Sequence, residues 1–203
     1  MPESKPPFHK IDRMEDEMRQ LEALLQELRQ FEVGNPPNER VTKALALVDG
    51  VMAPHKEYFL QNRILIIYHG SLQYNDPYHL DLDLTFTTES QGALQNSYKV
   101  QSAIEQQFTN LPDWPGMDGK TYCDTNFSSS SVEQISIDQR KAAEASYILT
   151  SKALFPEQES LLEEFREKVR KALEKLPVLR RRVIKDIASV ISTRQERKAE
   201  RME

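Results

Sequence analysis

The chain has 203 residues, a net charge of −5 and a single cysteine, Cys123. The acidic balance argues against general binding to nucleic-acid backbones, which requires a positive field. One cysteine excludes an internal disulfide and fits a reducing cytosol. No apolar run reaches the roughly 20 residues of a membrane span, and residues 1–7 lack the apolar core of a secretory signal. We therefore expect a cytoplasmic protein built as one compact domain, or as a small domain with a helical annex.

The N-terminal part of the chain is predicted to be helical after a flexible tail of residues 1–9. Hydrophobic residues recur at helical spacing from Asp12 to Phe31. Asp12 can cap this helix, and the sequence from Gly34 to Pro37 ends it. A helix with one apolar face must pack that face against another surface. We expect this surface to belong to the same chain, and a homodimer is the alternative. A second helix is expected over 38–52.

Strands are predicted in the middle of the chain. The first runs from Arg63 to His69 and meets a turn at Gly70-Ser71, and the second runs from Leu80 to Thr87. A helix over 90–110 and a loop rich in proline and glycine follow. A third strand is expected over 120–127, and the serine run after it is expected to be a loop.

The C-terminal part of the chain is predicted to be helical from Asp138 onward. Apolar stripes end near Phe155 and at Pro177, and a last helix begins at Pro177. Strands flanked by helices in this order predict an α+β chain. We divide it into the tail, a sheet-bearing domain over 10–135 with an N-terminal helical extension, and a C-terminal helical region over 136–203.

Two carboxylates one residue apart lie on the second predicted strand, at Asp81 and Asp83. Side chains alternate along a strand, so both point to the same face. Adjacent like charges repel each other and raise each other's pKa, and a hard divalent cation such as Mg²⁺ removes that penalty. The alternative is an exposed edge strand with charges that prevent aggregation.

The pattern of Gly70-Ser71, nine residues, then Asp81-Leu82-Asp83 resembles the signature of the DNA polymerase β-like nucleotidyltransferase superfamily. The resemblance covers roughly residues 60–130. It implies a small mixed sheet of the polymerase β-like fold with a helical C-terminal bundle beside the active-site cleft. It also implies that the two aspartates hold two Mg²⁺ ions and that a third carboxylate comes from a later strand. One departure is the sequence Leu72-Gln-Tyr74, where many relatives carry arginine and small residues.

Candidates for the third carboxylate come from the region of the third strand. Asp124 lies on that predicted strand, where the superfamily places its third acid, and it can serve as metal ligand or as base. Asp118 lies in a turn-like setting and Asp138 is typical of a helix N-cap, so both remain alternatives.

Residues that could contact the nucleotide are Gly70, Ser71 and Lys152. Gly70 allows close backbone approach, and Ser71 can donate its hydroxyl and backbone N–H to a phosphate oxygen. Lys152 could neutralise a triphosphate, or it could be a solvated lysine. For His69 and His79 the expectation is an ordinary hydrogen bond at a strand end.

The resemblance predicts an Mg²⁺-dependent nucleotidyltransferase that binds ATP and moves AMP to a hydroxyl of a small molecule, with Asp81, Asp83 and Asp124 as catalytic and metal-binding residues. A protein acceptor in a toxin–antitoxin pair is one alternative. A degenerate fold used as a binding module, or a helical interaction protein, is another. The cluster of Arg180, Arg181 and Arg182 is expected to be a solvated helix face.

Overall fold

A mixed four-stranded sheet lies between two layers of helices in the computed structural model, which describes residues 8–72, 79–109, 122–200 and 202. The strands are β1 (Leu65–Leu72), β2 (His79–Thr88), β3 (Tyr122–Ser131) and the short β4 (Lys152–Ala153). The helices are α1 (Phe8–Gly34), α2 (Glu39–Met52), η1 (Ala53–His55), α3 (Lys56–Gln61), α4 (Gln91–Thr109), α5 (Val132–Ile135), α6 (Ala142–Thr150), η2 (Pro156–Gln158), α7 (Glu159–Lys175) and α8 (Pro177–Glu200). The predicted α+β class with a small mixed sheet is confirmed.

The strand order in the sheet is β3-β2-β1-β4. β1 pairs antiparallel with β2 and with β4, while β2 and β3 are parallel. A parallel pair needs a long crossover, and α4 lies between β2 and β3 in the chain to provide it. The parallel pairing decides which residues of β3 lie opposite the aspartates of β2.

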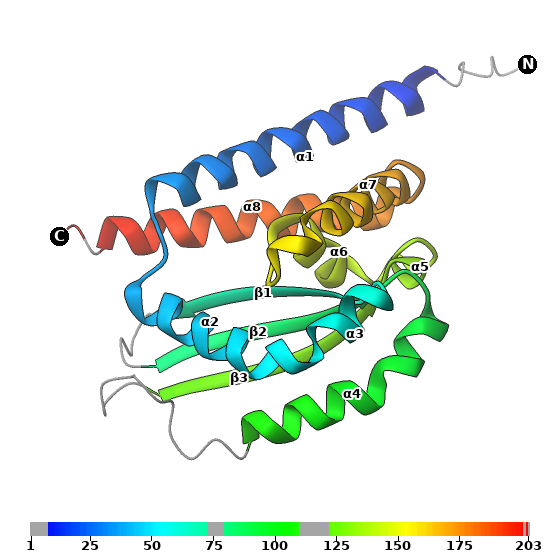
Figure 1. The fold of residues 1–203 in the computed structure, drawn as a ribbon. Coiled ribbons are helices and arrows are strands. Elements are labelled where there is room, and N and C mark those ends of the chain that lie inside the picture. Colours follow the sequence, from blue (N-terminus) through cyan, green and yellow to red (C-terminus); the bar gives the residue numbers. More distant parts are fainter. Residues whose placement is uncertain (1–7, 73–78, 110–121, 201, 203) are drawn as a thin grey trace, which may run out of the picture.

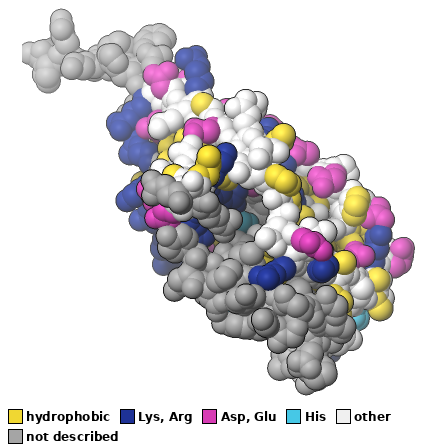
Figure 2. Space-filling model, turned by 90° about the vertical axis from the view of Figure 1, so that its left-hand side faces the viewer, with side chains coloured by type: hydrophobic (Ala, Val, Ile, Leu, Met, Phe, Trp, Pro, Cys, Tyr) yellow, Lys and Arg dark blue, Asp and Glu magenta, His cyan; other side chains and the backbone are white. Residues whose placement is uncertain are grey.

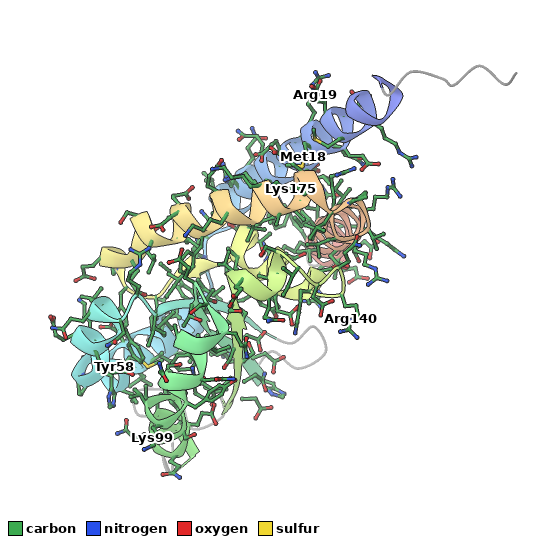
Figure 3. The ribbon with its side chains drawn as sticks, turned by 90° about the vertical axis from the view of Figure 1, so that its right-hand side faces the viewer. Met18, Arg19, Tyr58, Lys99, Arg140 and Lys175 are labelled. Atoms are coloured by element: carbon green, nitrogen blue, oxygen red, sulfur yellow. The ribbon has the colours of Figure 1, made fainter. Side chains whose placement is uncertain are left out.

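Helices cover both faces of the sheet (Figure 1). On one face, Ile66, Leu84 and Phe86 pack with buried side chains of α2, α3 and α4. On the other face, Leu65 and Ile67 pack with buried side chains of α1, α6, α7 and α8. Figure 3 shows the two layers from the side, with Tyr58 and Lys99 labelled on the first and Met18 and Lys175 on the second. The predicted aspartates lie on the second face.

The N-terminal helix covers its own chain, as expected. Leu21, Leu25 and Leu28 of α1 are buried in the same cluster as Ile187 and Ile191 of α8, and the two helices run side by side in Figure 1. α1 begins at Phe8, so Asp12 lies inside the helix and the expectation that it caps the helix is wrong. The next helix does begin as expected, because the Asn38 side chain accepts a hydrogen bond from the backbone N–H of Arg40 at 2.9 Å.

The serine run forms strand and not the expected loop. β3 continues to Ser131 and pairs with β2 along its whole length. Hydroxyl groups link the two strands, from Thr85 to Ser128 at 2.8 Å and from Thr87 to Ser130 at 3.0 Å. Threonine and serine can therefore pair across strands and hold a polar sheet face together. Ser131 ends the strand and caps α5, accepting from the N–H of Gln134.

Replacing Gln158 by alanine is expected to destabilise the fold by about 2–4 kcal/mol. Its buried amide accepts from the N–H of Ile66 at 3.0 Å and donates to the carbonyl of Ile64 at 2.7 Å. The change would leave both buried backbone groups without a partner. Urea denaturation measures the loss, and Glu157→Ala is the neighbouring control because the exposed Glu157 pairs with Lys56 at the surface. Equal stability of the two variants would contradict the expectation.

Candidate metal centre

The aspartates Asp81 and Asp83 share one face of β2. Leu80, Leu82 and Leu84 of the same strand are fully buried toward α2 and α4, while Asp81 and Asp83 remain partly exposed on the opposite side. The prediction that both carboxylates point to the same face is confirmed. β2 is an interior strand of the sheet, so the alternative of a charged edge strand is wrong.

β3 places a third carboxylate opposite the pair. In the parallel register Asp81 lies directly opposite Asp124, and Asp83 lies opposite Asn126. Paired residues of neighbouring strands point to the same face, so Asp124 joins the aspartates of β2. The expectation that Asp124 lies on the third strand is confirmed.

Asp138, one of the alternatives to Asp124, lies in the turn before α6. Its carboxylate accepts hydrogen bonds from the guanidinium and the backbone N–H of Arg140, which hold the pKa of Asp138 below its ordinary value. Arg140 extends outward in Figure 3. The N-cap position of α6 is Lys141, so Asp138 stabilises the turn and does not cap that helix. Asp118, the other alternative, lies outside the described residues.

His79 lies between two of the carboxylates. Its Nε2 atom is 2.6 Å from Oδ2 of Asp124 and 3.5 Å from Oδ1 of Asp81. One donor atom from each of the three residues lies within 4.8 Å of the others. The expected hydrogen bond of His79 is present, but the sequence reasoning missed its position between two acids. The signal was available, because His79 precedes Asp81 by two residues and so shares its strand face.

Asp83 is held by two other side chains. Its Oδ1 accepts from the amide of Asn126 at 3.1 Å, and its Oδ2 accepts from the hydroxyl of Tyr147 at 3.3 Å. Burial and then the charge of Asp83 raise the pKa of Tyr147, which keeps the phenol protonated as a donor. Asn126 could have been found by its spacing from Asp124. Tyr147 comes from α6, and no local pattern in the sequence pointed to it.

Gly70 and Ser71 lie inside β1, and the expected turn is absent at these two residues. Gly70 pairs with Leu82 and Ser71 with Asp81 in the antiparallel register. A Cβ atom on Gly70 would lie 3.0 Å from Cγ1 of Val41 and 3.3 Å from Cδ1 of Leu82. The glycine therefore allows α2 to pack closely on the sheet, and its backbone angles need no glycine. The Ser71 side chain lies outside the described part of the structure.

Gly70 and Lys152 line one cavity of about 260 Å³ at the edge of β1. Lys152 lies on the fourth strand, β4, which the sequence reasoning did not predict, opposite Tyr68. Arg194 and Arg197 of α8 also line the cavity. Figure 2 shows a hollow with Lys and Arg side chains around it on this side of the molecule. These three cations outnumber Glu32, the one acid among the described residues that line the cavity, which favours an anionic occupant.

His69 connects this cavity to the aspartates. It lines the cavity and is the strand partner of Asp83. Burial and the charge of Arg194 lower the pKa of His69, although Asp83 and Glu32 act in the opposite direction. Glu32 pairs with Arg194 at 2.8 Å. A ligand that extends from the cavity to the aspartates would pass His69.

The chain matches no protein-family model, no curated protein and no solved structure in three comparisons. Among the described helices, none is both long and apolar enough to cross a membrane. Any functional conclusion therefore depends on the geometry of the aspartates, of their hydrogen-bond partners and of the neighbouring cavity.

Proposed function

We propose that the chain is an Mg²⁺-dependent nucleotidyltransferase of the polymerase β-like kind, which transfers AMP from ATP to a hydroxyl group of a small molecule. One observation carries the proposal. Asp81 and Asp83 share a strand face, and Asp124 lies directly opposite Asp81 on the neighbouring parallel strand. This is the constellation that the resemblance in the sequence implies, and carboxylate oxygens are the ligands that Mg²⁺ prefers.

The three aspartates would hold the metal ions. The interior strand β2 carries both Asp81 and Asp83, and hydrogen bonds from Asn126 and Tyr147 fix the orientation of the Asp83 carboxylate. Bound Mg²⁺ supplies neutralisation of phosphate charge and polarisation of the attacking hydroxyl. The rest of the chemistry is positioning, which rigid strands serve better than loops.

In the proposed reaction the acceptor oxygen forms a bond to the α-phosphorus of ATP, and the bond from that phosphorus to the bridging oxygen of the β-phosphate breaks. Pyrophosphate leaves with the electron pair of that bond. Asp124 accepts the proton of the hydroxyl, and its side chain is 60% exposed and within 2.6 Å of the His79 ring. The proton can therefore pass on to solvent.

The cavity at the edge of β1 supports the choice of a small molecule. It provides Gly70 and the cations Lys152, Arg194 and Arg197 for an anionic ligand. Its volume of about 260 Å³ is close to the lower end of small-molecule sites. A space of this size seats part of a nucleotide or a small acceptor, and it is too small for a folded protein segment. We therefore favour a small acceptor over a protein.

Calorimetry with ATP and Mg²⁺ tests the proposal. The wild type is expected to bind ATP only with Mg²⁺ present, and Asp81→Asn/Asp83→Asn is expected to weaken that binding on the order of 100-fold, because both carboxylate charges are lost with little change of shape. Circular dichroism and thermal melting of both proteins establish that the variant is folded. Absent Mg²⁺-dependent binding in the wild type, or undiminished binding in the variant, would contradict the proposal.

A further inference from the structure

We propose that His79 is a direct ligand of a transition-metal ion, which it shares with Asp81 and Asp124. The donor set is then one imidazole nitrogen and two carboxylate oxygens, and ions of the Zn²⁺ and Co²⁺ class are expected to bind to it more tightly than Mg²⁺. This inference rests on the metal-binding part of the proposed function, and it changes which ion the site takes when no nucleotide is present.

The three donors come from fixed positions on two paired strands. His79 and Asp81 are two residues apart on β2, and Asp124 is the register partner of Asp81 on β3. Backbone hydrogen bonds of the sheet therefore fix the spacing of all three side chains. The Nε2 atom of His79 already lies 2.6 Å from Oδ2 of Asp124 and 3.5 Å from Oδ1 of Asp81.

The two distances from His79 fit a metal ion after a small movement. Ligands about 2.1 Å from a zinc-class ion lie about 3.0–3.4 Å apart at octahedral or tetrahedral angles. The separation of 3.5 Å between His79 and Asp81 is close to this range. The pair of His79 and Asp124 must widen by less than about 1 Å from its hydrogen-bond distance, as the proton between them gives way to the ion.

Exposure of the three side chains leaves the site open on one side. The side chain of His79 is 13% exposed, that of Asp81 is 33% exposed and that of Asp124 is 60% exposed. The nitrogen ligand is thus partly shielded from water, while the Asp124 side remains accessible. Three protein ligands with an open position are typical of sites where an ion meets a water molecule or a substrate.

The chemistry of the donors favours a transition metal over Mg²⁺. Imidazole nitrogen suits Zn²⁺ and the other late first-row ions, and their affinity for a given mixed site rises along the series from Mn²⁺ to Cu²⁺. Mg²⁺ prefers oxygen ligands and gives up its water reluctantly. Removal of the imidazole should therefore weaken the binding of Zn²⁺ and Co²⁺ far more than the binding of Mg²⁺.

Co²⁺ titration of the untagged, metal-free protein without nucleotide tests this inference. The electronic absorption of bound Co²⁺ reports nitrogen coordination, and competition with Zn²⁺ gives the second affinity. His79→Ala is expected to lower both affinities on the order of 10–100-fold and to change Mg²⁺ affinity by only about twofold. His55→Ala is the matched control, since His55 lies on η1 in the opposite helical layer and is expected to leave all three affinities unchanged.

Three outcomes would overturn the inference. One is wild-type Co²⁺ binding that His79→Ala leaves intact, and the second is an equal loss of Mg²⁺ and Co²⁺ binding in that variant, which would assign His79 to orientation of Asp124. Both results concern His79→Ala, so neither contradicts the Mg²⁺-dependent ATP binding of the wild type on which the proposed function rests. The third is a wild type that binds neither Co²⁺ nor Mg²⁺, with or without ATP, which contradicts both proposals.

Discussion

Asparagine in place of Asp81 or Asp83 is expected to reduce AMP transfer on the order of 10³-fold, and Asp124→Asn is expected to reduce it about 10²-fold. The larger loss is expected for Asp81 and Asp83 because they lie on an interior strand and their carboxylates would be the metal ligands. The exposed Asp124 would act in part as the base, which solvent can replace to some extent. The measurement is the initial rate at which label from ATP is transferred as AMP to small molecules of a cell extract at saturating Mg²⁺.

Asp138→Asn is the matched control for this series. It removes the same charge and preserves the same shape in a turn where the carboxylate pairs with Arg140. Its transfer rate is expected to stay within about twofold of the wild type, because a surface pair contributes little. Full activity of Asp83→Asn would contradict the assignment of the site. A loss in Asp138→Asn equal to that in Asp81→Asn would assign the effect to general instability.

The shared strand face of Asp81 and Asp83 could be predicted because it depends on local geometry alone. Alternation along any strand places Asp81 and Asp83 together, whichever strands surround them. Three helical predictions have a similar local basis: those over 38–52, from Asp138 onward and after Pro177. Apolar periodicity and a proline at the start of a helix favour helix formation within a few residues, so the sequence alone reveals them. The α+β class followed from the order of these elements.

The features that the sequence did not predict depend on distant parts of the chain. Tyr147 reaches Asp83 across 64 positions of sequence, and β4 exists only because Lys152 and Ala153 meet β1. Gly70 was predicted to be part of a turn, but it is a site of close packing against Val41 of α2. A glycine between a strand and a polar segment is compatible with either role, and only the position of α2 distinguishes them. The same is true of the serine run, which pairs with threonines of β2.

Arg180 of α8 is buried and forms an ion pair with α1. The expectation that the arginine cluster is a solvated helix face is therefore wrong for Arg180. Its side chain is 5% exposed and donates to Glu17 of α1 at 2.6 Å and to the carbonyl of Leu173 at 2.9 Å. Arg180→Met is expected to destabilise the protein by about 2–4 kcal/mol, because methionine fills much of the space but cannot replace the buried hydrogen bonds to Glu17 and to the carbonyl of Leu173. Urea denaturation followed by circular dichroism measures the change.

Arg181→Met provides the control, since Arg181 also contacts Glu17 at 3.2 Å but its side chain is 48% exposed. Water can replace that interaction, so a cost below about 1 kcal/mol is expected. The two variants remove the same type of side chain from adjacent positions and differ chiefly in burial. A similar stability of both variants would contradict the buried role of Arg180.

The ion pairs of Glu17 with Arg180 and Arg181 predict how the stability of the fold depends on pH. Partial burial raises the pKa of Glu17, but the hydrogen bonds from Arg180 and Arg181 outweigh it, so the pKa lies below the ordinary value of 4.5. The stabilisation is fully present above that ordinary value and is lost as pH falls through the lowered value of the folded chain. The melting temperature of the wild type should therefore drop as the pH falls below the ordinary value of 4.5, and the drop should be smaller in Arg180→Met. Glu32 lies near the other end of α1 and lines the cavity at the edge of β1 together with Arg194. If this cavity binds ATP as proposed, a displaced α1 should also weaken ATP binding at a pH where Arg180→Met is still folded.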